Sequence, residues 1–244
     1  MPINMGYDRD AIVGAISTAL NAFYTALIAN LDSVNINKVM KRKNPYLFRA
    51  KAIISAQKIV EAILSAFVSS SEETIFGYVF FEPIATVASQ GQKALAEGID
   101  IMVERDNTIF AIAVKSGTNV FNADSRKKQE QNFTAAGKLA QQVKKRYVPI
   151  IGYGYGKKSA SGRGLAKFYI ELAGQQFWTE LTGDPQFYID LIKLMDGLPE
   201  RYKEEFDSAY QKAENRLLKE FTNAFCLDDG SINWEKLVEF NSGS

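Results

Sequence analysis

Two short apolar segments constrain the fold of this chain most. One has an acid near its start, and the other has a lysine at its end. Residues 99–103 and 108–115 predict two strands, and the polar residues 104–107 between them predict a turn. Asp100 stands among apolar neighbours, and Lys115 is the only charge of the second segment. The sequence therefore predicts a hairpin that brings an aspartate and a lysine together.

The residue two places before the lysine is an alanine. Because side chains alternate across a strand, Ala113 and Lys115 share one face of the predicted hairpin. An aspartate and a lysine at the end of a hairpin are typical of metal-dependent phosphodiesterases, in which a carboxylate normally occupies the position of Ala113. The pattern therefore indicates a metal-dependent phosphodiesterase in which the second acid is replaced by Ala113.

Residue counts narrow the chemistry further. The chain has no histidine and a single cysteine, Cys226, which excludes a histidine general base and histidine or cysteine zinc sites. A metal would be held by carboxylates, carbonyls and water, which favours magnesium or manganese. The lone thiol and the lack of an apolar leader predict a cytoplasmic protein without a membrane partner. With a net charge of +1, attraction to a polyanion would require a local basic surface.

Hydrophobic periodicity predicts helices, then a mixed core, then helices again. The expected helices are 10–29, 47–67, one from about 72 to 88, 124–146, 175–181, 185–195 and 200–224. The expected strands beyond the hairpin are 147–153 and 165–171. Residues 31–46 are expected to be a connection, and residues 69–73 a break that caps the next helix.

The hairpin pattern resembles the PD-(D/E)xK nuclease superfamily. Several segments make the resemblance more specific, because they are similar, in this order, to type II restriction endonucleases that cut GGNCC-like sites. These are KNPYLFRAK at 43–51, SSEETIFG at 70–77, KSGTN at 115–119, GQQFW at 174–178 and DGSINWEKLVEFN at 229–241. The resemblance runs from about residue 43 to the C-terminus.

The resemblance implies an α/β fold, with a PD-(D/E)xK core of a mixed central sheet flanked by helices, an N-terminal helical region and a helical C-terminal part. We expect residues 1–68 to be a helical dimerisation region and residues 69–244 to be the nuclease core with its C-terminal helices. The implied activity is Mg²⁺-dependent hydrolysis of double-stranded DNA, with Mn²⁺ as a substitute. A palindromic, GC-rich site, a homodimer and a cognate DNA methyltransferase are implied as well.

The resemblance also assigns roles to single residues. Asp100 would hold the metal, the carbonyl of Val114 would be a further ligand, and Lys115 would orient the attacking water. An acid from the preceding helix often completes such sites, and Glu82 is the preferred residue, with Glu73 second. On one unbroken helix these two acids would lie on opposite faces, so only one could line the site.

Ala113 leaves three explanations open, because a methyl group cannot bind a cation. We favour a variant inactivated by replacement of an acid, since the neighbouring family segments are intact. Alternatively, the carboxylate has migrated to Glu82 or Glu104, or the protein binds DNA without cutting it. A structure-specific repair nuclease with a migrated carboxylate is a further alternative.

Basic clusters and short polar side chains predict the DNA-binding surface. The candidate residues are Lys43, Ser116, Asn119, Asn122, Lys127, Lys144, Lys157 and Arg163.

Overall fold

The computed structural model describes residues 3, 6–158 and 168–243, and the contacts divide the chain into two compact units. The sheet unit comprises Met1–Ala22 and Phe76–Pro199, and the helical unit comprises Phe23–Ile75 and Glu200–Ser244. The sequence analysis places one boundary at residue 68. The contacts divide the chain at other points, since the C-terminal helices pack with residues 23–75.

The sheet unit contains a five-stranded mixed sheet in the order β1-β2-β3-β4-β5. Strands β1, β2 and β3 are antiparallel, whereas β3, β4 and β5 are parallel. The strands are β1 (Gln92–Lys93), β2 (Ile101–Arg105), β3 (Thr108–Lys115), β4 (Arg146–Tyr153) and β5 (Ile170–Ala173). The predicted α/β fold with a mixed sheet flanked by helices is confirmed. The sequence analysis missed β1, which has only two residues.

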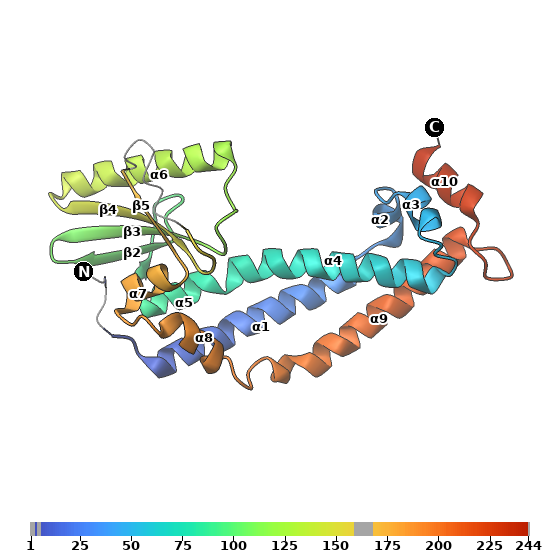
Figure 1. The fold of residues 1–244 in the computed structure, drawn as a ribbon, viewed down its shortest axis with the longest axis horizontal. Coiled ribbons are helices and arrows are strands. Elements are labelled where there is room, and N and C mark those ends of the chain that lie inside the picture. The colour runs from blue at the N-terminus through green and yellow to red at the C-terminus, as the bar shows by residue number, and fades with distance from the viewer. Residues whose placement is uncertain (1–2, 4–5, 159–167, 244) are drawn as a thin grey trace. The chain divides into compact units, whose positions relative to one another are not determined.

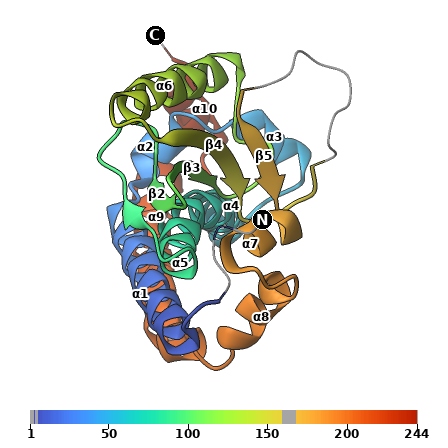
Figure 2. The ribbon, with the colours of Figure 1, turned by 90° about the vertical axis from the view of Figure 1, so that its left-hand side faces the viewer.

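Helix α6 (Ala123–Gln142) covers one face of the sheet, and α5 (Phe81–Ala88) and α7 (Gln175–Thr182) lie at the other face (Figures 1 and 2). Beneath α6, Phe133 packs in one buried cluster with Ala113 and Ile151. Helix α7 approaches β4 closely, because glycine at position 152 leaves room for the ring of Phe177. Helix α8 (Phe187–Leu194) packs against α7.

The region before the sheet is more helical than the sequence analysis predicts. The expected connection over residues 31–46 is wrong, because α2 (Ile36–Met40) and the start of α3 (Pro45–Ala50) lie there. The side chains of Asn35 and Asn44 cap these two helices. Such short helices carry too few residues for a periodic signal, although their caps are visible in the sequence.

The single helix expected over residues 47–67 is also wrong. Helix α3 ends at Ala50, and α4 (Ala56–Val79) begins after a short turn and runs through residues 69–73. The serines and glutamates there occupy the helix interior, where the Thr74 hydroxyl donates to the Ser70 carbonyl. Packing of the apolar stripe therefore overrides a local capping signal.

Helix α4 ends one residue before Phe80, and α5 begins at Phe81. Pro83 lies in the first turn of α5, where a missing N–H costs no intrahelical bond. Glu73 and Glu82 therefore stand on different helices and in different units. The single helix expected from about 72 to 88 is therefore wrong, and the comparison of the two acids on one unbroken helix does not apply.

The helical unit has a core of its own. Helices α9 (Glu200–Phe225) and α10 (Trp234–Ser242) contribute Leu217 and Leu237 to a buried cluster with Leu64 of α4. Arg216 closes the end of α1 (Arg9–Ser33), because its guanidinium donates to the Leu31 carbonyl at 2.9 Å. The sequence analysis missed α10. By its length and a mean hydropathy of 1.6, α1 could also cross a membrane. This is weak evidence, because the core helices of soluble proteins pass the same test.

The contact between β4 and α7 gives a stability prediction. A Cβ atom at Gly152 would overlap the ring of Phe177, whereas a Cβ at Gly14 of α1 meets no atom within 4 Å. We expect Gly152→Ala to destabilise the protein by about 2 kcal/mol or more through overpacking. The matched Gly14→Ala should stabilise it by up to about 1 kcal/mol. Urea denaturation measures both, and an unchanged Gly152→Ala midpoint would contradict the packing described.

Candidate active site

Asp100 and Lys115 lie together at the end of the hairpin, as the sequence predicts. One oxygen of Asp100, Oδ2, accepts a hydrogen bond from the Val114 N–H at 2.6 Å and lies 3.5 Å from Lys115 Nζ. The two side chains are 24% and 27% exposed, so solvent reaches both. Among the described residues, Oδ1 of Asp100 accepts no hydrogen bond, which leaves this oxygen free for a cation.

The end of the sheet explains this arrangement. Asp100 precedes the first residue of β2, yet its N–H still donates to the Ile112 carbonyl at 2.9 Å. The N–H of Val114 points to the same edge, where β2 supplies no further backbone partner, and the Asp100 side chain takes that place. Because the N–H and C=O of one strand residue point to the same side, the Val114 carbonyl is directed toward this edge as well.

Glu82 lies near β1, the strand that pairs with the beginning of β2. Its carboxylate lies 3.4 Å from Lys93 Nζ, and Lys93 pairs with Ile101 in the sheet. The next residue, Ala94, donates its N–H to the Asp100 carbonyl. Since Lys93 is 82% exposed, its ion pair with Glu82 is weak and a cation could replace it. In the part of the chain that the structure describes, no three acids form a metal cluster.

Ala113 is completely buried. It packs with Ala111, Phe133, Ile151 and Tyr153 in the cluster beneath α6. A glutamate at position 113 would place its carboxylate among these apolar and aromatic side chains. The alanine fits its surroundings as a core residue.

The opposite end of the sheet holds two other candidates. Glu104 stands four residues beyond Asp100, about 13 Å along the strand, and pairs with Lys145 at 2.5 Å. Lys144 lies two residues before the start of β4. The first residue of β4, Arg146, pairs with Thr108, at the opposite end of β3 from Lys115. The structure therefore brings neither Glu104 nor Lys144 to the site of Asp100.

A second charged cluster lies on the α6 face of the sheet. Ala113, Ile151 and Glu171 are partners in register on β3, β4 and β5. One oxygen of Glu171 lies 2.9 Å from an Arg126 nitrogen and 2.6 Å from Lys158 Nζ. The Glu171 side chain is only 9% exposed, so its charge is balanced inside the protein and not by solvent.

Burial and hydrogen bonding shift two pKa values in this cluster. Burial lowers the pKa of Arg126, but its hydrogen bonds to Glu171 and Tyr169 more than offset that effect, and the pKa rises. Burial and the hydrogen bond to Glu171 both raise the pKa of Tyr153. Glu171 is not among the residues predicted from the sequence, although it is an acid within the apolar segment 169–173, as Asp100 is within its own apolar segment.

The remaining DNA-binding candidates are scattered. Ser116 is half-buried and its carbonyl accepts from the Tyr155 N–H, while Asn119 is exposed beside it. Asn122 caps α6 by accepting from the Ser125 N–H, so its amide oxygen is already used. The others are exposed Lys127 on α6, exposed Lys157 after β4, Lys43 in the helical unit, and Arg163, which lies outside the described residues.

An aspartate and a lysine at the end of a mixed sheet, flanked by helices on both faces, define a PD-(D/E)xK-like nuclease fold. Comparison with protein families matches residues 10–205 to the type II restriction endonuclease EcoO109I family, and the chain belongs to this family. A comparison with curated proteins gives no match. The fold and the family agree with the resemblance seen in the sequence.

The buried charge cluster gives a second stability prediction. Glu171→Gln leaves Arg126 and Lys158 without their shared negative partner, and we expect a loss of about 2 kcal/mol in unfolding free energy. The matched Glu104→Gln removes an exposed pair and should cost less than about 0.5 kcal/mol. Thermal denaturation at neutral pH compares the two, and equal losses would contradict the role assigned to Glu171.

Proposed function

We propose that this restriction endonuclease hydrolyses double-stranded DNA at a palindromic, GC-rich site with Mg²⁺ as its cofactor. The observation that supports the proposal most is the Asp100–Lys115 pair at the open end of the hairpin. Hydrolysis of a phosphodiester requires a carboxylate that can bind a metal ion and a cationic group that can stabilise the charge on the phosphate. Asp100 and Lys115 would provide these two groups side by side.

The donors around Asp100 fit a hard divalent cation. The free Oδ1 of Asp100, the Val114 carbonyl and the Glu82 carboxylate are all oxygen ligands, which magnesium and manganese prefer. When bound, the metal would polarise the phosphate and lower the pKa of a water molecule. Lys115 would orient that water and stabilise the negative charge that develops on the phosphate.

The buried position of Ala113 bears on the three explanations for the missing acid. Its packing beneath α6 favours a core alanine with the second carboxylate supplied from elsewhere. Glu82 pairs with Lys93 of β1, next to the start of β2, whereas Glu104 lies at the far end of β2. We therefore propose Glu82 as the migrated carboxylate, and the inactivated variant becomes the alternative that the cleavage experiment tests.

Assembly and cellular context follow from the proposed target. A palindromic site is met most simply by a two-fold dimer, and the N-terminal helices are the proposed dimerisation element. Such an endonuclease requires a cognate methyltransferase to protect the host DNA, and both would act in the cytoplasm. A non-cleaving DNA-binding protein and a repair nuclease without a fixed sequence are the rival functions.

Plasmid digestion with Mg²⁺ tests the catalytic proposal. We expect the unmodified chain to give discrete fragments, and Asp100→Asn, Lys115→Ala and Glu82→Gln each to lower the rate at least about 100-fold. Glu104→Gln is the matched control and should cut normally. Specific binding in Ca²⁺ should persist in all four variants, because the fold does not depend on these charges.

Ala113→Glu separates the alternatives. If the second acid has migrated, this variant should unfold more easily by about 2 kcal/mol and cut no faster, because it buries a carboxylate in a packed cluster. An inert unmodified chain with an active Ala113→Glu variant would establish the inactivated variant instead. If neither protein cuts, the DNA-binding alternative replaces the enzyme. Fragments without a fixed end sequence would favour the repair nuclease.

The salt dependence of binding tests the proposed DNA surface. Each lysine that contacts a phosphate adds about 0.9 to the slope of log affinity against log salt. Replacing Lys127 and Lys157 by alanine should lower that slope by about 1 to 2, whereas Lys144→Ala should leave it nearly unchanged. Fluorescence anisotropy with a labelled duplex measures the slopes. A larger change of slope in Lys144→Ala than in the Lys127 and Lys157 variant would place the DNA at the other end of the sheet. Separately, sedimentation of a monomer would exclude the dimer.

A further inference from the structure

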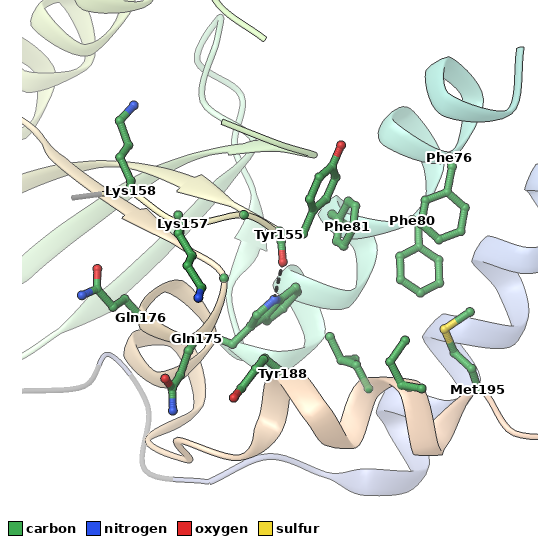
Figure 3. A pocket seen from close by; sticks show the side chains of 17 residues that line it. Phe76, Phe80, Phe81, Tyr155, Lys157, Lys158, Gln175, Gln176, Tyr188 and Met195 are labelled. Carbon is green, nitrogen blue, oxygen red and sulfur yellow. Dashed lines mark hydrogen bonds between the residues drawn. The ribbon is translucent and has the colours of Figure 1, made fainter. Parts of the chain in front are cut away.

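A large cavity opens within the sheet unit, between the last residues of β4 and helices α5, α7 and α8. Its volume is about 830 Å³, which is in the range of ligand-binding pockets. Figure 3 shows its aromatic wall, in which the rings of Phe76 and Phe80 stack at 4.3 Å and Phe81 lies beside Tyr155. The Trp178 indole forms part of the lining and donates to the Gly154 carbonyl.

The cavity has an apolar end and a polar end. Leu191, Ile192 and Met195 of the α8 region line the apolar end, and Ile192 is 72% exposed. Lys157 lines the polar end and points into the cavity, whereas Lys158 points away toward Glu171 (Figure 3). Within the described part of the chain, Lys157 forms no hydrogen bond or ion pair. A ligand with a flat apolar body and a negative group would match both ends.

The cavity adjoins the candidate active site. Tyr155 donates its N–H to the Ser116 carbonyl, and its ring lies where a Cβ on Gly117 would stand. Tyr153, two residues earlier, is the in-register partner of Lys115 across β3 and β4. Adjacent strands lie about 4.8 Å apart, so the end of β4 that leads into the cavity lies beside the end of β3 that carries Lys115.

We propose that this cavity receives one nucleobase that rotates out of the bound DNA duplex. The base would lie against the half-exposed ring of Tyr155, and Lys157 would contact the phosphate of the same nucleotide. Aromatic side chains bind an unstacked base through its flat face, and an unpaired lysine complements the phosphate. The inference rests on the proposed function, since it takes DNA to be the substrate.

A protein segment is the main rival occupant, for instance an apolar helix of a second copy. Two observations favour the base. The cavity adjoins the backbone of the hairpin that carries Lys115, through the hydrogen bond from the Tyr155 N–H to the Ser116 carbonyl, and Lys157 in its lining suits a nucleotide better than an apolar helix.

Mismatched duplexes test the proposal with the full chain in Ca²⁺. Unpairing costs least at a mismatch, so a mismatch at the rotated position should tighten binding about tenfold, while mismatches elsewhere in the site should weaken it about tenfold. The duplex carries the site mapped by plasmid cleavage, or, for a chain that does not cut, the site selected by binding from a random pool. Failure to cut thus counts only against the proposed function.

Two tyrosine variants complete the test. Tyr155→Ala removes the proposed stacking ring and should abolish the tighter binding to the mismatched duplex, whereas Tyr78→Ala, an exposed tyrosine outside the cavity, should retain it. Weaker binding at every mismatch would overturn the proposal. So would an unchanged gain in Tyr155→Ala. Dissociation of a dimer by Ile192→Asp, without any mismatch effect in the unmodified chain, would assign the cavity to a second copy.

Discussion

The hydrogen bond from the Val114 N–H to the Asp100 carboxylate holds the candidate site together. At this point β2 ends while β3 continues, and a backbone donor would otherwise be left without a partner. The side chain of Asp100 satisfies it with one oxygen and leaves the other oxygen free. The same bond places the carboxylate 3.5 Å from Lys115 Nζ. A feature of sheet geometry thus positions the two groups on which the proposed chemistry depends.

The residues in register across β3, β4 and β5 separate two charged regions of the sheet unit. Asp100 and Lys115 form an open pair that solvent reaches, whereas Glu171 forms a nearly closed cluster with Arg126 and Lys158. Between them Ala113 and Ile151 pack beneath α6 without polar groups. An acid at position 113 would join the two regions, and the alanine keeps them apart. Under the proposed function, the second carboxylate is Glu82, which lies near the β1 edge of the sheet.

The sequence predicts the centre of the fold well and its surroundings less well. The hairpin and β4 could be recognised because apolar alternation and turn residues act locally. The break at Phe80 and the course of α4 through residues 69–73 depend on packing, which overrides weak capping signals. Asp100 and Lys115 could be paired because they lie in one hairpin. Pairing across β5, α6 and the end of β4 depends on long-range register, so the role of Glu171 could not be predicted.

Metal binding tests the central claim most directly, because the account assigns a divalent cation to Asp100, Val114 and Glu82 although Ala113 offers no ligand. Isothermal titration of Mn²⁺ into the complex of the full chain with its duplex measures that binding. The account predicts a saturable site that is lost in Asp100→Asn, strongly weakened in Glu82→Gln and unchanged in Glu104→Gln. Equal affinity in the unmodified chain and Glu82→Gln would contradict it, and so would the absence of any site that Asp100→Asn removes.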